Sequence, residues 1–140
     1  MPTYDEVDVG TTIPACVVNV QRADLVRYAG ASGDFNVIHW NERVATGVGL
    51  PNVIAHGMFT MAAAGRLVTD WVGDPTRVES YGVRFSSPVP VPDDDTGTDL
   101  TISGEVTEKL DGGRVRVLLT ATIGADTKVL SAARAVVRLD

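Results

Sequence analysis

The alternation of apolar and polar positions predicts one long helix near the middle of the chain, over residues 57–72. Its positions are apolar almost all round, which is typical of a helix that is covered on several sides. The small residues at 62–65 leave little side-chain bulk, so a sheet could approach the helix backbone closely. Gly73-Asp74-Pro75 follows and predicts the end of the helix. This helix is therefore expected at the centre of the fold.

Strands are predicted on both sides of this helix in the sequence. One precedes it and four follow it, at residues 13–20, 78–85, 100–108, 114–123 and 128–139. Glycine-containing turns separate the last three, which is the pattern of an antiparallel meander. A period of two places five residues of the fourth strand on one face: Val115, Val117, Leu119, Ala121 and Ile123. Together these elements predict an α+β fold in which a single antiparallel sheet curls around one long central helix.

The second face of this sheet is also expected to carry apolar residues. They are Leu118, Leu130 and Val136. Large apolar surfaces are usually covered by another part of a protein. The second face is thus predicted to contact a partner subunit.

Shorter elements surround the long helix. Helices are predicted at 22–29, from apolar residues at helical spacing, and at 37–45, with Asn36 as the N-cap. The three prolines at 88, 90 and 92 indicate an extended edge or loop, because proline lacks the N–H that a sheet ladder needs.

Length and charge narrow the function classes. The 140 residues have the usual size of one domain, taken as 1–140. The formal net charge of −6 argues against nucleic acid as a general partner, since phosphate binding needs clustered Lys and Arg. No stretch approaches the ~18 apolar residues of a membrane span, and the acidic N-terminus lacks the apolar run of a signal peptide. A single cysteine, Cys16, excludes an intrachain disulfide and suits a reducing compartment. We therefore expect a cytoplasmic protein.

The most informative motif is Gly33-Asp34-x-Asn36-x-x-His39. A carboxylate and an imidazole on one short loop can hold a water or a substrate hydroxyl between them, and histidine exchanges protons near neutral pH. Asn36 could orient either group or the reacting water. The alternative for such an isolated motif is structural, with Asp34 as a turn residue and His39 as a satisfied helix residue.

A second candidate site is His56-Gly57, at the start of the long helix. The free N–H groups and positive dipole end of a helix can stabilise a developing oxyanion, and glycine allows the closest approach. The alternative is that Gly57 only relieves crowding. His56 is expected to bind the loop that positions Gly57. With two histidines and no Cys or Glu at ligand spacing, no metal site is expected.

Taken together, the two segments resemble the signature of the MaoC-like, R-specific hydratase and dehydratase family of the hot-dog fold. That motif is an aromatic residue, small residues, Gly-Asp-x-Asn-Pro-hydrophobic-His and, after five intervening residues, Ala or Ser. The sequence matches it at Tyr28, Ser32, Gly33, Asp34, Asn36, Ile38, His39 and Ala45. The family's second landmark, His-Gly before the central helix, is matched by His56-Gly57. One departure is Val37, which replaces a proline that would pre-set the backbone.

The resemblance implies a single hot-dog domain and a hydro-lyase without a cofactor. The implied substrate is a (3R)-hydroxyacyl thioester of acyl carrier protein or coenzyme A. Asp34 and His39 would together move the C2 proton and the C3 hydroxyl, which releases water and a trans-2-enoyl thioester. Gly57 would polarise the thioester carbonyl through its N–H, and Asn36 would help to position the pair. The reverse reaction is hydration of the enoyl thioester.

Three further stretches, 71–75, 81–85 and 89–92, resemble the branch of the family that provides catalytic subunits of mycobacterial (3R)-hydroxyacyl-ACP dehydratases. That branch serves type II fatty acid and mycolic acid elongation. The resemblance therefore implies a heterodimer with a sister hot-dog subunit that lacks the catalytic pair. Because acyl carrier proteins are acidic, docking would need a local basic patch, from Arg66, Arg77 or Arg84, or one supplied by the partner.

Other interpretations stay open. A homodimeric (R)-specific enoyl-CoA hydratase would have the same residues and chemistry with a different carrier. A non-catalytic hot-dog subunit that binds acyl chains belongs to another class, and the joint presence of Asp34, Asn36 and His39 counts against it. A hot-dog thioesterase has no distinctive support in the sequence.

Overall fold

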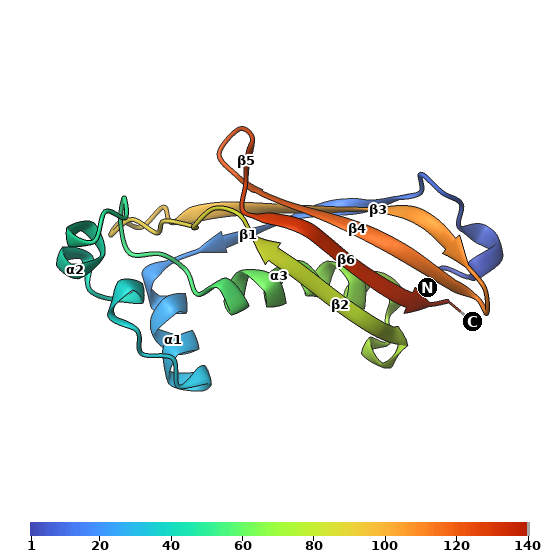
Figure 1. The fold of residues 1–140 in the computed structure, drawn as a ribbon, viewed down its shortest axis with the longest axis horizontal. Coiled ribbons are helices and arrows are strands. Elements are labelled where there is room, and N and C mark those ends of the chain that lie inside the picture. The colour runs from blue at the N-terminus through green and yellow to red at the C-terminus, as the bar shows by residue number, and fades with distance from the viewer. Residues whose placement is uncertain (140) are drawn as a thin grey trace.

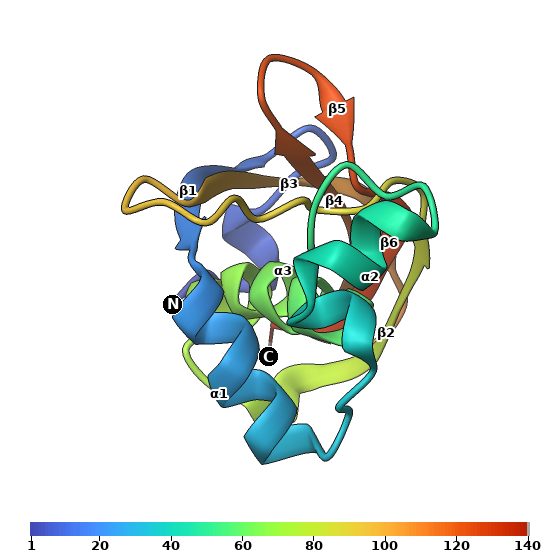
Figure 2. The ribbon, with the colours of Figure 1, turned by 90° about the vertical axis from the view of Figure 1, so that its left-hand side faces the viewer.

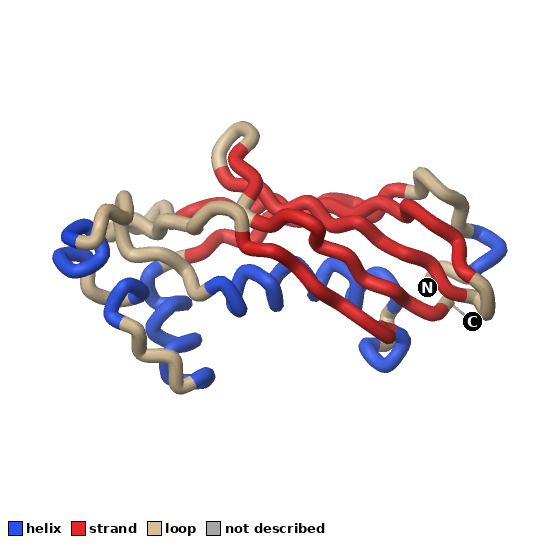
Figure 3. The backbone as a smooth tube through the Cα atoms, viewed as in Figure 1, coloured by secondary structure: helices blue, strands red, loops and turns tan. Residues whose placement is uncertain are grey.

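The computed structural model describes residues 1–139 and contains one antiparallel sheet with the strand order β1-β3-β4-β6-β2 (Figure 1). Its long strands are β1 (Thr12–Val20), β2 (Val78–Phe85), β3 (Thr98–Leu110), β4 (Arg114–Ile123) and β6 (Leu130–Arg138). The short β5 (Thr127–Lys128) pairs with β4. Helix α3 (Gly57–Val72) lies along the inner face of the curled sheet (Figure 3), so the expected α+β architecture is confirmed.

Helix α3 begins and ends at the residues that the sequence predicts. Ala64, Leu67, Val68 and Val72 are buried in the core. Their spacing of three and four residues puts them on one face of the helix, towards the sheet. The helix is not covered on every side, however, because Met58 is 57% exposed.

The small residues of α3 allow the close approach that was predicted. A Cβ atom at Gly65 would lie 2.9 Å from Cε1 of Tyr81 on β2. The Tyr81 hydroxyl donates a hydrogen bond of 2.7 Å to the Met61 carbonyl, one turn earlier on the helix. Glycine at 65 therefore leaves the space that the tyrosine ring occupies.

The alternation of β4 follows the prediction. Val115, Val117, Leu119 and Ala121 are all buried on the inner face, while Leu118 between them is 36% exposed on the outer face. These inner-face residues form the floor on which α3 packs.

Leu130 corrects the predicted outer face, because it lies in the core and is only 2% exposed. A bulge in β6 explains the difference. The register of β6 against β2 shifts beyond Gly82, and Ala132 has a left-handed φ of 47°. An extra residue in one strand inverts the alternation, so Leu130 and Ala133 both face inward. The outer face is thus less apolar than predicted.

Three helical segments form a separate group beyond the N-terminal end of α3, on the left of Figure 1 and facing the viewer in Figure 2. They are α1 (Arg22–Ser32), η2 (Val37–His39) and α2 (Glu42–Gly47). The predicted helix 37–45 is therefore wrong in its continuity. Asn36 caps only η2, and Asn41 starts a new helix by accepting a hydrogen bond of 3.1 Å from the N–H of Val44.

The proline-rich segment is extended, as predicted, and it pairs with the chain just before α3. The N–H of Ala55 donates to the Val89 carbonyl, and the N–H of Val91 donates to the Val53 carbonyl, each at 2.9 Å. These bonds fix the loop that leads into Gly57. Two short helical turns, η1 (Tyr4–Glu6) and η3 (Pro75–Arg77), complete the fold. None of the helices within residues 1–139 has the length and apolar character to cross a membrane.

Candidate active site

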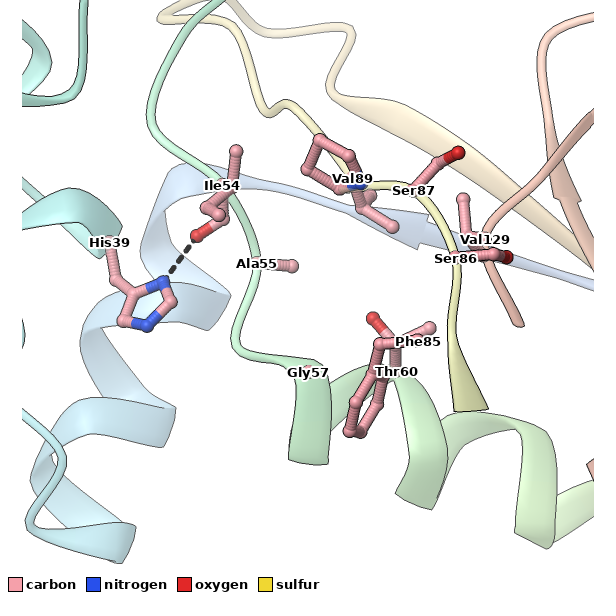
Figure 4. A pocket seen from close by; sticks show the side chains of 11 residues that line it. His39, Ile54, Ala55, Gly57, Thr60, Phe85, Ser86, Ser87, Val89 and Val129 are labelled. Atoms are coloured by element: carbon pink, nitrogen blue, oxygen red, sulfur yellow. Dashed lines mark hydrogen bonds between the residues drawn. The ribbon is translucent and has the colours of Figure 1, made fainter. Parts of the chain in front are cut away.

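His39 is buried at the end of η2, and its ring is fixed by one main-chain contact. Its Nδ1 lies 2.7 Å from the Ile54 carbonyl oxygen (Figure 4). Because a carbonyl can only accept a hydrogen bond, Nδ1 carries the proton and Nε2 is left with a free lone pair. His39 therefore presents a proton acceptor at Nε2.

Asp34 lies opposite this nitrogen, with 3.9 Å between its Oδ2 and Nε2 of His39. That separation is too long for a direct hydrogen bond. A single oxygen atom, from water or from a substrate hydroxyl, can lie within hydrogen-bond distance of both groups at once. The carboxylate is half exposed, so such an oxygen can reach it.

The loop around Asp34 is held by local hydrogen bonds. Gly33 ends α1 with a left-handed φ of 77°, which turns the chain sharply. The N–H of Asp34 then donates to Ser32 Oγ, and the N–H of Asn36 donates to Asp34 Oδ1 at 3.1 Å. The Asn36 side chain accepts from the N–H of Ile38 at 3.3 Å. In this structure Asn36 thus shapes the loop.

His56 corrects one expectation, because it does not bind the loop that positions Gly57. Its Nε2–H donates a hydrogen bond of 3.0 Å to the main-chain carbonyl of Asp34, 22 residues earlier. Its ring also stacks on His39, with 3.8 Å between centroids, and lies 4.7 Å from the Tyr28 ring. Sequence reasoning missed this contact because it joins two segments that are distant along the chain.

Gly57 is the first residue of α3, so its N–H has no acceptor within the helix. It lines a pocket of about 300 Å³ together with His39, Thr60 and Phe85 (Figure 4). A Cβ atom at position 57 would lie 3.0 Å from Cε1 of Phe85, so any other residue here would need the Phe85 ring to shift. The structure thus brings His39 and Gly57 to one pocket, whereas Asp34 and Asn36 are not among the residues that line it.

Asp34, His39 and His56 each place one ligating atom within 4.8 Å of the others, the spacing of a metal site. The orientation of the rings argues against one. Nδ1 of His39 and Nε2 of His56 already face carbonyl oxygens. The lone pairs of the other two nitrogens lie in ring planes only 22° apart and stacked. Side-by-side lone pairs cannot converge on one ion at the ~2.0–2.1 Å that zinc requires.

Thr60 is a residue that the sequence analysis did not single out. It is 3% exposed and lies in the wall of this pocket. A threonine inside a mostly apolar helix gives no signal of chemistry, because the sequence does not show which face meets the pocket.

The chain matches the family described as the MaoC like domain over residues 5–125. Among characterised proteins, it is 41% identical over 97 residues to 3-hydroxyacyl-thioester dehydratase X of Mycobacterium tuberculosis, which covers 64% of this chain and 34% of that protein. The chain therefore spans about a third of the length of this relative.

Two solved structures share the fold closely. One is described as a MaoC-like dehydratase, with a TM-score of 0.95 and 38% identity over 99% of this chain and 42% of the other. The second is the R-hydratase PhaJ1 from Pseudomonas aeruginosa, with a TM-score of 0.84 and 27% identity over 99% of this chain and 86% of the other. The family match covers most of the sequence, and the neighbours match nearly all of the structure. This chain belongs to the MaoC-like dehydratase family and has its hot-dog fold.

Proposed function

We propose that this protein catalyses the reversible dehydration of (3R)-3-hydroxyacyl thioesters to trans-2-enoyl thioesters. The observation that carries the proposal is the 3.9 Å gap between Asp34 Oδ2 and a free Nε2 of His39. The gap lies beside a pocket that also contains the N-terminus of α3. The names of the dehydratase and R-hydratase relatives agree with this chemistry.

In the proposed reaction, the thioester oxygen lies against the N–H of Gly57. Nε2 of His39 removes the C2 proton, and negative charge develops on the thioester oxygen. The Gly57 N–H and the helix dipole stabilise that charge, and one such donor is typically worth ~2.7–4 kcal/mol. The C3–O bond then breaks, and the imidazolium returns its proton to the leaving hydroxyl as water. Asp34 accepts a hydrogen bond from this hydroxyl and holds it in place.

Isosteric variants of the pair test the proposal. Asp34→Asn and His39→Gln keep the approximate size of each side chain; the first removes the carboxylate charge that holds the hydroxyl, and the second removes the imidazole base. Each is expected to lower the rate of crotonyl-thioester hydration by at least about 100-fold, the usual contribution of acid–base catalysis. Asp126→Asn, in the exposed turn after β4, is the matched control and should retain the rate. Near-normal hydration by both site variants would refute the assignment.

We also propose a partner, either a non-catalytic sister hot-dog subunit or a second copy, beside the edge strand β2. Strand β2 pairs on one side with β6 and is the last in the described sheet. Phe85 at its end and Met58 on α3 are 55% and 57% exposed close to the pocket. In the solved MaoC-like dehydratase structure described above, the matched part is 42% of a longer chain, which leaves room there for a second unit.

The partner and the carrier can be separated by two measurements. Native mass spectrometry of the protein co-expressed with the product of the neighbouring gene distinguishes a heterodimer from a homodimer. Rates on coenzyme A and acyl carrier protein thioesters of equal chain length identify the carrier. We expect a heterodimer that prefers the acyl carrier protein and acts in type II fatty acid or mycolic acid elongation. A homodimer that prefers coenzyme A would instead support an (R)-specific enoyl-CoA hydratase.

A further inference from the structure

The pocket that contains Gly57 also contains one buried hydroxyl group, that of Thr60. Threonines inside helices commonly turn their hydroxyl back to a carbonyl of the preceding turn. Thr69 does so on the same helix, donating to the Arg66 carbonyl at 3.1 Å, and Thr46 donates to Glu42 at 2.8 Å. Among the side-chain hydrogen bonds within residues 1–139, none comes from the Thr60 hydroxyl, and its oxygen is not one of the fully buried atoms without a partner, so it borders open space. Its hydrogen-bonding capacity is therefore available to a group in the pocket.

The position of Thr60 on α3 places this hydroxyl beside Gly57. The two residues are three apart, so they lie on the same face and about 4.5 Å from each other along the helix axis. Side chains on a helix lean towards its N-terminus, so the Thr60 hydroxyl lies over the first turn. Figure 4 shows its oxygen turned into the space bounded by Ala55 and Phe85.

The other hydroxyls in the pocket wall are differently placed. Those of Ser86 and Ser87 point away from this space in Figure 4. The Ser86 hydroxyl donates to the Lys128 carbonyl at 3.1 Å. Among the serines and threonines of the pocket wall, Thr60 is thus the one whose hydroxyl faces the first turn of α3.

We propose that the Thr60 hydroxyl is a second donor to the thioester oxygen, beside the N–H of Gly57. This inference rests on the proposed function, because it names a second group that stabilises the same developing charge. The hydroxyl gains most from its hydrogen bond when the oxygen becomes negative, since hydrogen bonds to charged acceptors are the stronger ones. Thr60 therefore acts on kcat more than on KM.

Two substitutions separate a donor from a packing residue. Thr60→Val keeps the volume and removes the hydroxyl, whereas Thr60→Ser keeps the hydroxyl and removes a methyl group. Thr60→Val is expected to lower kcat by about 100-fold with little change in KM, as for the loss of one oxyanion donor. Thr60→Ser should stay close to the parent rate. Thr69→Val, on the same helix but outside the pocket, is the matched control and should keep full activity.

The opposite order of activities would overturn the inference. If Thr60→Val keeps its kcat while Thr60→Ser loses it, the side chain acts through packing alone. Equal loss in both variants would have the same meaning.

A vibrational measurement tests the donor without turnover. In the Asp34→Asn background, the C=O stretching band of bound crotonyl-coenzyme A reports the hydrogen bonds to its oxygen. Adding Thr60→Val should move this band to higher frequency, and adding Thr60→Ser should not. If the band does not move in Thr60→Val, the proposed hydrogen bond from Thr60 is refuted, even if the parent is an active hydratase. If the band moves but the parent protein does not hydrate enoyl thioesters, the hydrogen bond is supported and the proposed reaction is rejected.

Discussion

His39 and His56 brace each other's segments through reciprocal bonds to the main chain. His39 donates to the carbonyl of Ile54, two residues before His56, and His56 donates to the carbonyl of Asp34, five residues before His39. Their rings stack between these bonds at 3.8 Å and 22°. The loop with the proposed acid–base pair and the loop that enters α3 are thus held as one unit.

Removing one half of this reciprocal pair should loosen the unit. His56→Phe keeps an aromatic ring on His39 but leaves the Asp34 carbonyl without its donor. Asp34 is exposed, so water can reach its carbonyl, and the net loss for one such hydrogen bond is typically about 0.5–1.5 kcal/mol. We expect a fall of this size in the free energy of unfolding, measured by urea denaturation, together with slower hydration. Tyr28→Phe, which keeps the neighbouring ring, is the control; equal stability of His56→Phe and the parent would contradict the role.

Restoring the family proline at position 37 should be tolerated. Val37 is the first residue of η2, where an N–H has no partner within the turn. Asn36 has a ψ of 126°, which suits a residue before proline. Val37→Pro is therefore expected to raise the free energy of unfolding by about 0.4–1 kcal/mol, because proline lowers the conformational entropy of the unfolded chain. Thermal unfolding measures the change. A lower melting temperature would show that the Val37 side chain itself stabilises the fold.

Gly65→Ala should destabilise the protein. The new Cβ would lie 2.9 Å from the Tyr81 ring, and such overpacking typically costs about 1–3 kcal/mol. Gly30→Ala is the matched control, because Gly30 lies in α1 with nothing within 4 Å of the added atom. That change should instead stabilise the helix by roughly 0.5–1 kcal/mol. Urea denaturation measures the free energy of unfolding of both variants. Similar changes in the two would refute the close contact between position 65 and the Tyr81 ring.

Tyr81 also gives the protein an alkaline limit. Burial raises the pKa of Tyr81 to about 12, above the value of about 10 for an unfolded tyrosine. Between these values the folded protein binds the phenol proton more tightly than the unfolded chain does. The contribution of the Tyr81 hydroxyl to the free energy of unfolding is fully present below about pH 10 and is lost as the pH rises towards 12.

Tyr81→Phe should remove that part of the alkaline loss. The variant loses the bond to the Met61 carbonyl and is less stable at neutral pH, but its unfolding free energy should fall less steeply in the alkaline range. Denaturation curves over a pH series give both slopes. Parallel slopes in the parent and the variant would show that Tyr81 does not titrate with unfolding.

Periodic patterns predicted the main elements well. The bounds of α3 and the buried face of β4 follow from short-range spacing, which the local sequence contains in full. The bulge at Ala132 could not be predicted, because alanine rarely takes a positive φ and the strain is set by pairing with β2. Leu130 was consequently assigned to the wrong face.

The site shows the same division. Asp34, His39 and Gly57 could be named because their motifs are compact in the sequence, and their roles stay predictions until they are tested. The partner of His56 and the orientation of Thr60 depend on how distant segments meet. The break between η2 and α2 depends on a competition between two caps, Asn36 and Asn41, that have similar sequence signals.

The reciprocal histidine bonds end on main-chain carbonyls, a group that every residue possesses. A substitution at position 34 can therefore remove the carboxylate while both histidine bonds to the main chain stay in place. Under the proposed function and partner, one copy could become catalytically silent in a single step after gene duplication and still fold, bind acyl chains and pair with its active sibling. Mixed pairs of active and silent subunits are thus an easily reached outcome for a protein built in this way.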